Sequence, residues 1–167
     1  MNKGISLVSL VVTIIIMLIL AGVTIYTSNI IENAQFQKVF SNMQLIKTKV
    51  NIINEKVLFE GAQSKTKYYV GLCLKDQSNK AQLAGNSLTA EELEDENYYI
   101  YNQAVLNSIG LNSVKLKSGE IYIVNYRSGD IIYPKGCKDM DGNTVYRLSE
   151  MMEWNQRSDV WGRKSDI

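Results

Sequence analysis

The sequence predicts an α+β fold in which one long N-terminal helix packs on a small antiparallel β-sheet. Three observations on the 167 residues support this prediction. The chain has no charged residue from Gly4 to Ile31, and apolar residues then recur every three or four positions as far as Val57. After Glu120 the apolar period changes to two, which is typical of strands.

The densest part of the apolar segment, residues 5–26, has the length of a membrane-spanning helix. Its 22 residues would extend about 33 Å, against a hydrocarbon core of about 30 Å. Ile, Leu and Val account for 14 of them, and these favour insertion by on the order of 4–8 kcal/mol. The segment is too long for a removable secretory signal and lacks an Ala-x-Ala cleavage site. Because Lys3 precedes it and Glu32 is the first charge after it, we expect the rest of the chain to lie outside the membrane.

The helical pattern continues beyond the membrane segment. Apolar residues at heptad spacing are Phe36, Val39, Met43, Ile46, Val50, Ile53 and Val57. No proline interrupts the pattern and Gly61 is the first break, so we expect one helix over residues 5–58, about 80 Å long. Two interpretations of this apolar face are open: it docks a sheet, or it packs against the helices of other subunits. Both can hold in different stretches.

Residues 62–154 predict one small outer α+β domain. We expect a strand at 68–74, a helix from about 90 to 109 that is interrupted around Glu96 and begins with a Thr89–Glu92 capping box, and strands at 120–126, 131–133 and 144–148. Pro134 should end its strand or place it at a sheet edge. The remaining residues, 155–167, form a polar tail that is either disordered or docked through Trp161.

The first five residues carry a more specific pattern. Met1-Asn2-Lys3-Gly4 is a short basic leader that ends in glycine, and an apolar helix follows directly from Ile5. This junction resembles the N-terminal signature of type IV pilins and of the related pseudopilins of type II secretion and competence systems. The resemblance implies a pilin-like fold, removal of leader residues 1–4 by a prepilin peptidase that cuts between Gly4 and Ile5, and N-methylation of Ile5. It implies as partners the peptidase, other pilin or pseudopilin subunits, an inner assembly platform protein and membrane lipid.

The chain departs from that family pattern at Ser9. The family usually has a glutamate at this fifth position of the mature helix, where it pairs with the amine of a neighbouring subunit, and a buried carboxylate is costly unless it is paired. Some minor and tip-located pseudopilins and many Gram-positive pilin-like chains also lack this glutamate. A less specific resemblance to clostridial pilin-like proteins covers residues 123–129 and 146–148.

The resemblance therefore implies a minor pilin or pseudopilin, a structural subunit assembled through its N-terminal helix. We expect a single-pass protein of the cell membrane with its C-terminal domain outside, which becomes part of an extracellular filament. Adhesion or motility pilus, secretion and DNA uptake all remain open. The alternative is a membrane-anchored extracellular binding domain that does not polymerise.

Other chemistry has few candidate residues. The chain has no histidine and no phosphate-binding glycine loop, so we expect neither enzymatic activity nor a cofactor. A net charge of +1 with scattered basic residues does not predict nucleic-acid binding. Cys73 and Cys137 are a candidate disulfide that would close a loop of about 64 residues and stabilise the domain by about 4 kcal/mol, with two free thiols as the alternative. Asp139, Asp141 and Asn143 are candidate calcium ligands, but they lack the EF-hand spacing, and a tight turn is the favoured interpretation.

Overall fold

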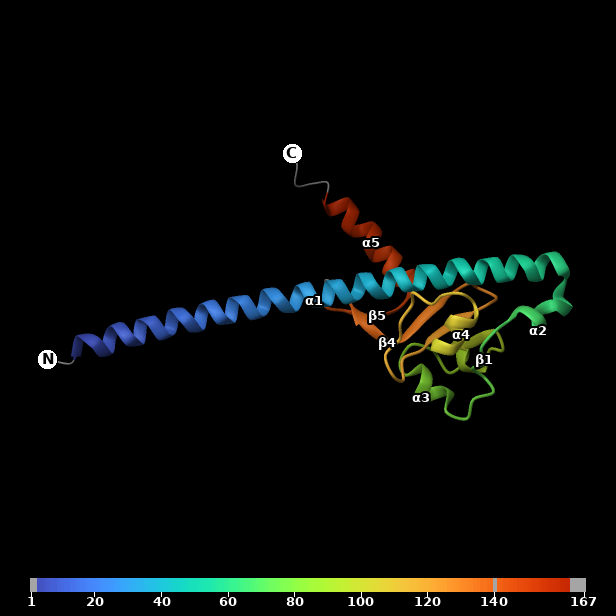
Figure 1. The fold of residues 1–167 in the computed structure, drawn as a ribbon, viewed down its shortest axis with the longest axis horizontal. Coiled ribbons are helices and arrows are strands. Elements are labelled where there is room, and N and C mark those ends of the chain that lie inside the picture. The colour runs from blue at the N-terminus through green and yellow to red at the C-terminus, as the bar shows by residue number, and fades with distance from the viewer. Residues whose placement is uncertain (1–2, 140, 163–167) are drawn as a thin grey trace.

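The computed structural model describes the backbone of residues 3–139 and 141–162, and the side chains of residues 10–18, 32–139 and 141–156. Within this part of the chain the fold is α+β, as the sequence predicts, with helices and a five-stranded antiparallel sheet. The helix α1 (Lys3–Glu60) lies along the sheet with its C-terminal half and projects far beyond it with its N-terminal half (Figure 1).

The other elements are short. After α1 follow η1 (Ala62–Ser64), α2 (Lys65–Tyr68), β1 (Leu72–Cys73), α3 (Lys80–Ala84), η2 (Glu92–Glu94), β2 (Tyr98–Tyr101), α4 (Gln103–Ser108), β3 (Tyr122–Asn125), β4 (Ile131–Lys138), β5 (Thr144–Arg147) and α5 (Leu148–Gly162). Each strand pairs antiparallel with the next one along the chain. The sheet is therefore a meander in the order β1-β2-β3-β4-β5.

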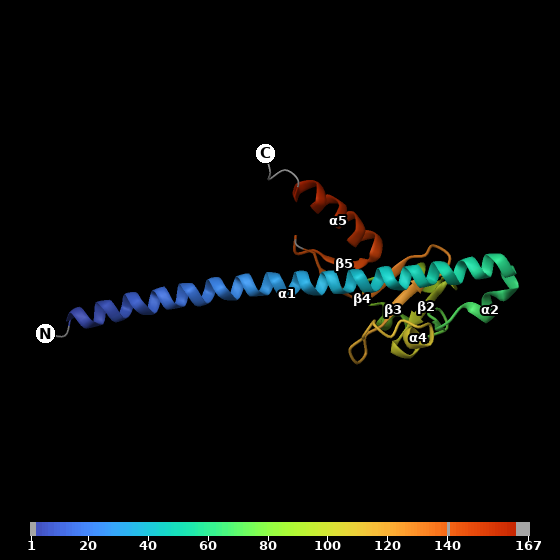
Figure 2. The same cartoon turned by 45° about the horizontal axis from the view of Figure 1, so that its top comes forward.

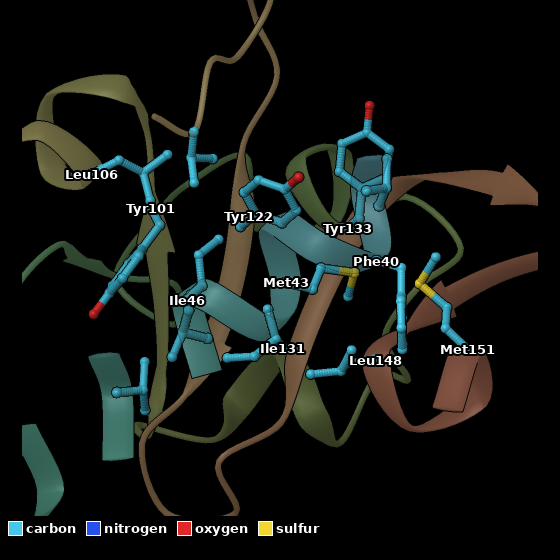
Figure 3. Close-up of a cluster of buried hydrophobic side chains, with 14 of the residues drawn as sticks. Phe40, Met43, Ile46, Tyr101, Leu106, Tyr122, Ile131, Tyr133, Leu148 and Met151 are labelled. Atoms are coloured by element: carbon cyan, nitrogen blue, oxygen red, sulfur yellow. The ribbon is translucent and has the colours of Figure 1, made fainter. Parts of the chain in front are cut away.

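The apolar face of α1 packs on the sheet, mainly on β4. All seven residues that the heptad pattern predicted are buried, and Met43, Ile46 and Val50 are completely so. All of them except Val57 share one buried cluster with side chains from every central strand and from α5, among them Tyr101, Tyr122, Ile131, Tyr133, Leu148 and Met151 (Figure 3). The prediction that this face docks a sheet is confirmed.

The opposite face of the sheet has a smaller core. Ile100, Ile123 and Ile132 are buried there beneath α3 and the segment that contains η2. Figure 1 shows α3 on the side of the sheet away from α1. The central strands are thus covered on both faces, and every residue of β3 is buried.

The helix α5 is an element that the sequence did not predict. Leu148, Met151 and Trp154 are buried, and the Trp154 ring meets the ring of Phe36 on α1 edge to face, with centroids 5.2 Å apart. After these turns α5 diverges from α1 (Figure 1 and Figure 2). The tail expected over 155–167 is therefore helical as far as Gly162. The side chain of Trp161 and residues 163–167 lie outside the described part of the chain.

The helix predicted over 90–109, with an interruption around Glu96, is confirmed only at its end, where α4 lies, and is wrong before that. That stretch contains η2, the strand β2 and the short helix α4. The Thr89–Glu92 capping box is present, with Thr89 N donating to the Glu92 carboxylate (2.9 Å) and Glu92 N to Thr89 Oγ1 (3.3 Å), but it caps a single 3₁₀ turn. The aromatic residues of β2 pack on both faces of the sheet, and this packing overrides the local helix signal.

The strand predictions hold with two changes. The strands expected at 120–126, 131–133 and 144–148 correspond to β3, β4 and β5, but the strand expected at 68–74 is reduced to Leu72–Cys73. The helix α2 includes Tyr68, and Gly71, just before β1, has a positive φ of 97°. Pro134 neither ends β4 nor lies on an edge strand. It sits where the β4–β5 register shifts between Ile132 and Cys137, beyond the last residue that pairs with β3, so its missing N–H removes no ladder hydrogen bond.

Candidate functional site

Residues 10–18 of α1 present an apolar surface that no other element of the described chain covers. Eight apolar residues between positions 10 and 18 are exposed by 46–70%: Leu10, Val11, Val12, Ile14, Ile15, Ile16, Met17 and Leu18. Consecutive apolar residues such as Ile14, Ile15 and Ile16 surround the helix on all sides. A helix that is apolar all round is stable only in hydrocarbon or among other helices. This surface is therefore the candidate functional site.

The same helix links this surface rigidly to the head domain, residues 62–156. Phe36 is the first described residue of α1 that is buried, and the head packs on the helix from there to Val57. From Lys3 to Phe36 the helix is about 50 Å long at ~1.5 Å per residue. Since α1 is continuous and contains no proline, a force on either end is transmitted along one element.

The predicted processing residues lie in the first turns of this helix. Because α1 begins at Lys3, both Gly4 and Ile5 have helical backbone, and so does Ser9. The first backbone N–H groups of a helix have no intrahelical partner, so the Gly4–Ile5 peptide is in a turn that opens at little cost. The side chains here lie outside the described part, so the roles of these three residues remain predictions.

The membrane-spanning segment predicted at 5–26 lies mainly on residues whose side chains are outside the described set, namely 5–9 and 19–26. Among the residues that the structure does describe, no helix is long and apolar enough to cross a membrane.

The candidate disulfide is wrong, because Cys73 and Cys137 are both free. Cys73 lies in β1 and Cys137 in β4, with β2 and β3 between them. Three strand spacings are about 14 Å, whereas a disulfide needs Cα atoms within about 7 Å. Burial raises the pKa of Cys137 to about 11, which keeps this thiol protonated and unreactive.

The candidate calcium ligands take part in a turn. The Asp139 carboxylate accepts hydrogen bonds from Asn143 N (2.8 Å) and Asn143 Nδ2 (3.3 Å), and Gly142 supplies the positive φ of 84° that the turn requires. Asp141 Oδ2 accepts instead from Trp154 Nε1 of α5 at 3.3 Å. Across the described residues no group of three His, Cys, Asp or Glu is placed to hold a metal ion.

A charged cluster around Arg147 is a feature that the sequence did not predict. Arg147 donates from Nη1 to Asp130 (2.6 Å), and from Nη2 to both oxygens of Glu92 (2.8 Å each) and to Ser87 O (3.3 Å). Burial opposes ionisation of Glu92, but hydrogen bonds from Thr89 and Arg147 outweigh it and lower the pKa of that carboxyl. Burial raises the pKa of Asp130 in spite of Arg147. Each charge has a partner, so the cluster ties three segments of the head together and has no free charge for a ligand.

Comparison of the chain with models of protein families, with curated proteins and with solved structures finds no match.

Proposed function

We propose that this chain is a structural subunit of a type IV pilin-like filament or pseudopilus, as a minor pilin or pseudopilin. The observation that supports this most directly is the apolar, uncovered surface of residues 10–18 of α1, which belongs to the same helix on which the head domain is built. A subunit of this shape can place its helix in a common core and its head on the outside.

The apolar surface also explains why such a subunit would be held in the membrane before assembly. Burial of an aliphatic side chain stabilises by about 1.5–3 kcal/mol, so covering the eight partly exposed residues between 10 and 18 is worth on the order of 10 kcal/mol. Lipid covers them before assembly and neighbouring helices cover them afterwards. Processing then consists of cleavage between Gly4 and Ile5 and methylation of Ile5, as in the family that the N-terminus resembles.

Ser9 favours a minor role over that of the abundant subunit. Apolar helices gain little from the hydrophobic effect when they associate in lipid, so polar contacts and close packing determine their register. A serine at this position provides no carboxylate to pair with a neighbouring amine. Such a chain fits best where subunits of another type set the register.

Intact-mass measurement of the full chain tests the proposal. The chain is produced with an active prepilin peptidase or with an inactive variant of it. The active peptidase should remove Met1 to Gly4 and add one methyl group, and Gly4→Val should block this processing. Gly22→Val, a matched change within the same helix, should be processed normally. A chain that still begins at Met1 beside an active peptidase contradicts the proposal.

The alternative is a membrane-anchored extracellular binding domain that does not polymerise, and the missing carboxylate at Ser9 is the observation in its favour. It predicts the same mass with either form of the peptidase. It also predicts that none of the chain enters a filament fraction sheared from cells that contain the assembly machinery, whereas the subunit proposal requires that some does.

A further inference from the structure

We propose that the groove between the C-terminal end of α1 and the sheet binds an N-acetylated saccharide. The groove is bounded by the last turns of α1, by the connection to α2, by the loop before β2 and by the end of β3. This inference goes beyond the filament role and does not depend on it, because every residue involved belongs to the head domain or to the part of α1 packed on it.

Stacked tyrosines form one wall of the groove. The rings of Tyr69 and Tyr126 lie 3.9 Å apart between centroids and within 5° of parallel, and Tyr99 meets both edge to face. Tyr126 is fixed further by the hydroxyl of Tyr101 (2.6 Å) and by the backbone N–H of Val70 (3.0 Å). The wall is therefore rigid before any ligand arrives. Because Tyr126 is buried behind it, the partly buried Tyr69 is the ring that can offer a flat aromatic surface to the C–H face of a pyranose ring.

Polar groups without partners line the same groove. Asn54 Oδ1 is buried and accepts no hydrogen bond, although Asn54 Nδ2 donates to Tyr126 O at 2.8 Å. An unsatisfied acceptor of this kind costs about 1–3 kcal/mol, which a donor from a ligand would recover after a small shift. Within the described residues the side chains of Lys65 and Glu96 form no ion pair and no hydrogen bond, and that of Arg127 has only an electrostatic attraction to Asp95 without a close contact, although all three are at the groove. In the Arg147 cluster, by contrast, every charge is paired.

The loop that carries Glu96 is held in place from both sides. The Asp95 carboxylate accepts from Asn97 N (2.9 Å) and from Asn97 Nδ2 (2.6 Å), and Asn97 O accepts from Tyr126 N (3.0 Å). Glu96 is thus presented from an ordered loop, which lowers the conformational entropy that binding would have to offset.

The mixture of charges selects the class of ligand. Lys65 and Arg127 are donors, whereas Glu96 and Asn54 provide acceptors, and a hydroxyl group can serve either kind. An anionic ligand would be repelled by Glu96, and a cationic ligand would be repelled by Lys65 and Arg127. An acetamido group adds an N–H donor for an amide acceptor and a methyl group that can pack on Leu58. An extended peptide fits less well, because it would pair with a sheet edge, and the edges here are β1 and β5.

Saturation-transfer NMR with the N-acetylglucosamine tetramer tests the proposal on the full chain. The chain is kept in a detergent without a sugar headgroup, because a glycosidic detergent would compete. We expect saturable binding with a Kd of about 1 mM or tighter, and a loss of about tenfold in affinity for Arg127→Ala and for Glu96→Gln. Both residues are exposed, so neither change threatens the fold.

Lys67→Ala is the matched control, because Lys67 lies on α2 beside Lys65 and does not line the groove. It should leave the affinity unchanged. Absence of saturable transfer up to about 10 mM tetramer overturns the proposal. So does binding that Arg127→Ala and Glu96→Gln leave unchanged, or equally tight binding of an unstructured peptide.

Discussion

Replacement of Met43 by alanine tests whether the apolar face of α1 holds the head together. Met43 is fully buried, and Figure 3 shows it between Phe40 and Tyr122. Truncation of a buried methionine removes its contacts and leaves a cavity that a rigid helix and sheet cannot close, at a cost of about 2–5 kcal/mol. Domains of this size are stable by about 5–15 kcal/mol, so the loss is a large fraction of the total.

We expect Met43→Ala to lower the melting temperature by about 10 °C, since each kcal/mol corresponds to about 4 °C for a domain of roughly 100 residues. Near-UV circular dichroism of the tyrosines, measured on the full chain in detergent, reports unfolding of the head. Leu45→Ala is the matched control, because Leu45 is two residues away on the same helix and 43% exposed. Its melting temperature should change by no more than about 2 °C. Equal effects of the two changes would refute the assignment of the face that docks the sheet.

Three further changes are expected to have distinct effects on the head. Arg147→Ala should destabilise it by about 2 kcal/mol at neutral pH, because Glu92 and Asp130 lose their shared cation. The pKa of Glu92 is lowered from 4.5 on folding, so its contribution is present above about pH 4.5 and disappears as the pH falls through the folded value. Melting curves at pH 7 and pH 3 should therefore differ less for Arg147→Ala than for the unchanged chain. A thiol reagent at pH 8 should modify the partly exposed Cys73 and spare the buried Cys137 until denaturant is added, and modification of both at one rate would contradict this. Trp154→Ala should lower stability by about 3 kcal/mol and reduce far-UV helicity, because α5 loses its contact with α1, and unchanged helicity would contradict this.

The sequence predicted the fold best in α1, where apolar residues recur at a regular spacing. A helix buried on one side has an apolar residue every three or four positions, and all seven residues identified in this way are buried. Phe40 was missed because it is covered from a different direction, in the cluster that includes Met151 and Trp154 of α5. A single heptad pattern identifies only the residues that face the sheet, so it omits a residue that faces α5.

The sheet was harder to predict where strands are covered on both faces. In β2 both Tyr98 and Tyr101 are buried although they point to opposite faces, so no alternation of apolar and polar residues marks the strand. The acidic residues and capping box that precede it favour a helix locally. The segment forms a strand because its side chains pack between α1 on one face of the sheet and α3 on the other. These contacts involve residues far away in the sequence.

The sites of the head have no local signature at all. The Arg147 cluster joins Glu92 to Asp130, and the proposed saccharide groove joins Asn54 to Arg127, residues that only the completed fold brings together. The disulfide prediction failed because the completed fold separates two residues that the sequence suggested as a pair. An even number of cysteines says nothing about strand order, and strand order places Cys73 and Cys137 too far apart.

The position of α5 determines where the head ends along α1. Without Met151 and Trp154, the Phe36 ring would lose the aromatic edge that covers it and would itself become exposed. With α5 in place, the exposed Glu32 lies just before the first buried residue, so in the proposed subunit a charge separates the surface covered by this chain from the surface left for lipid or other helices. In the proposed filament subunit, the two halves of one helix therefore meet different partners without competing for the same side chains. The stability of the head then does not depend on whether its helix lies in a membrane or in a filament, as a subunit that moves between the two requires.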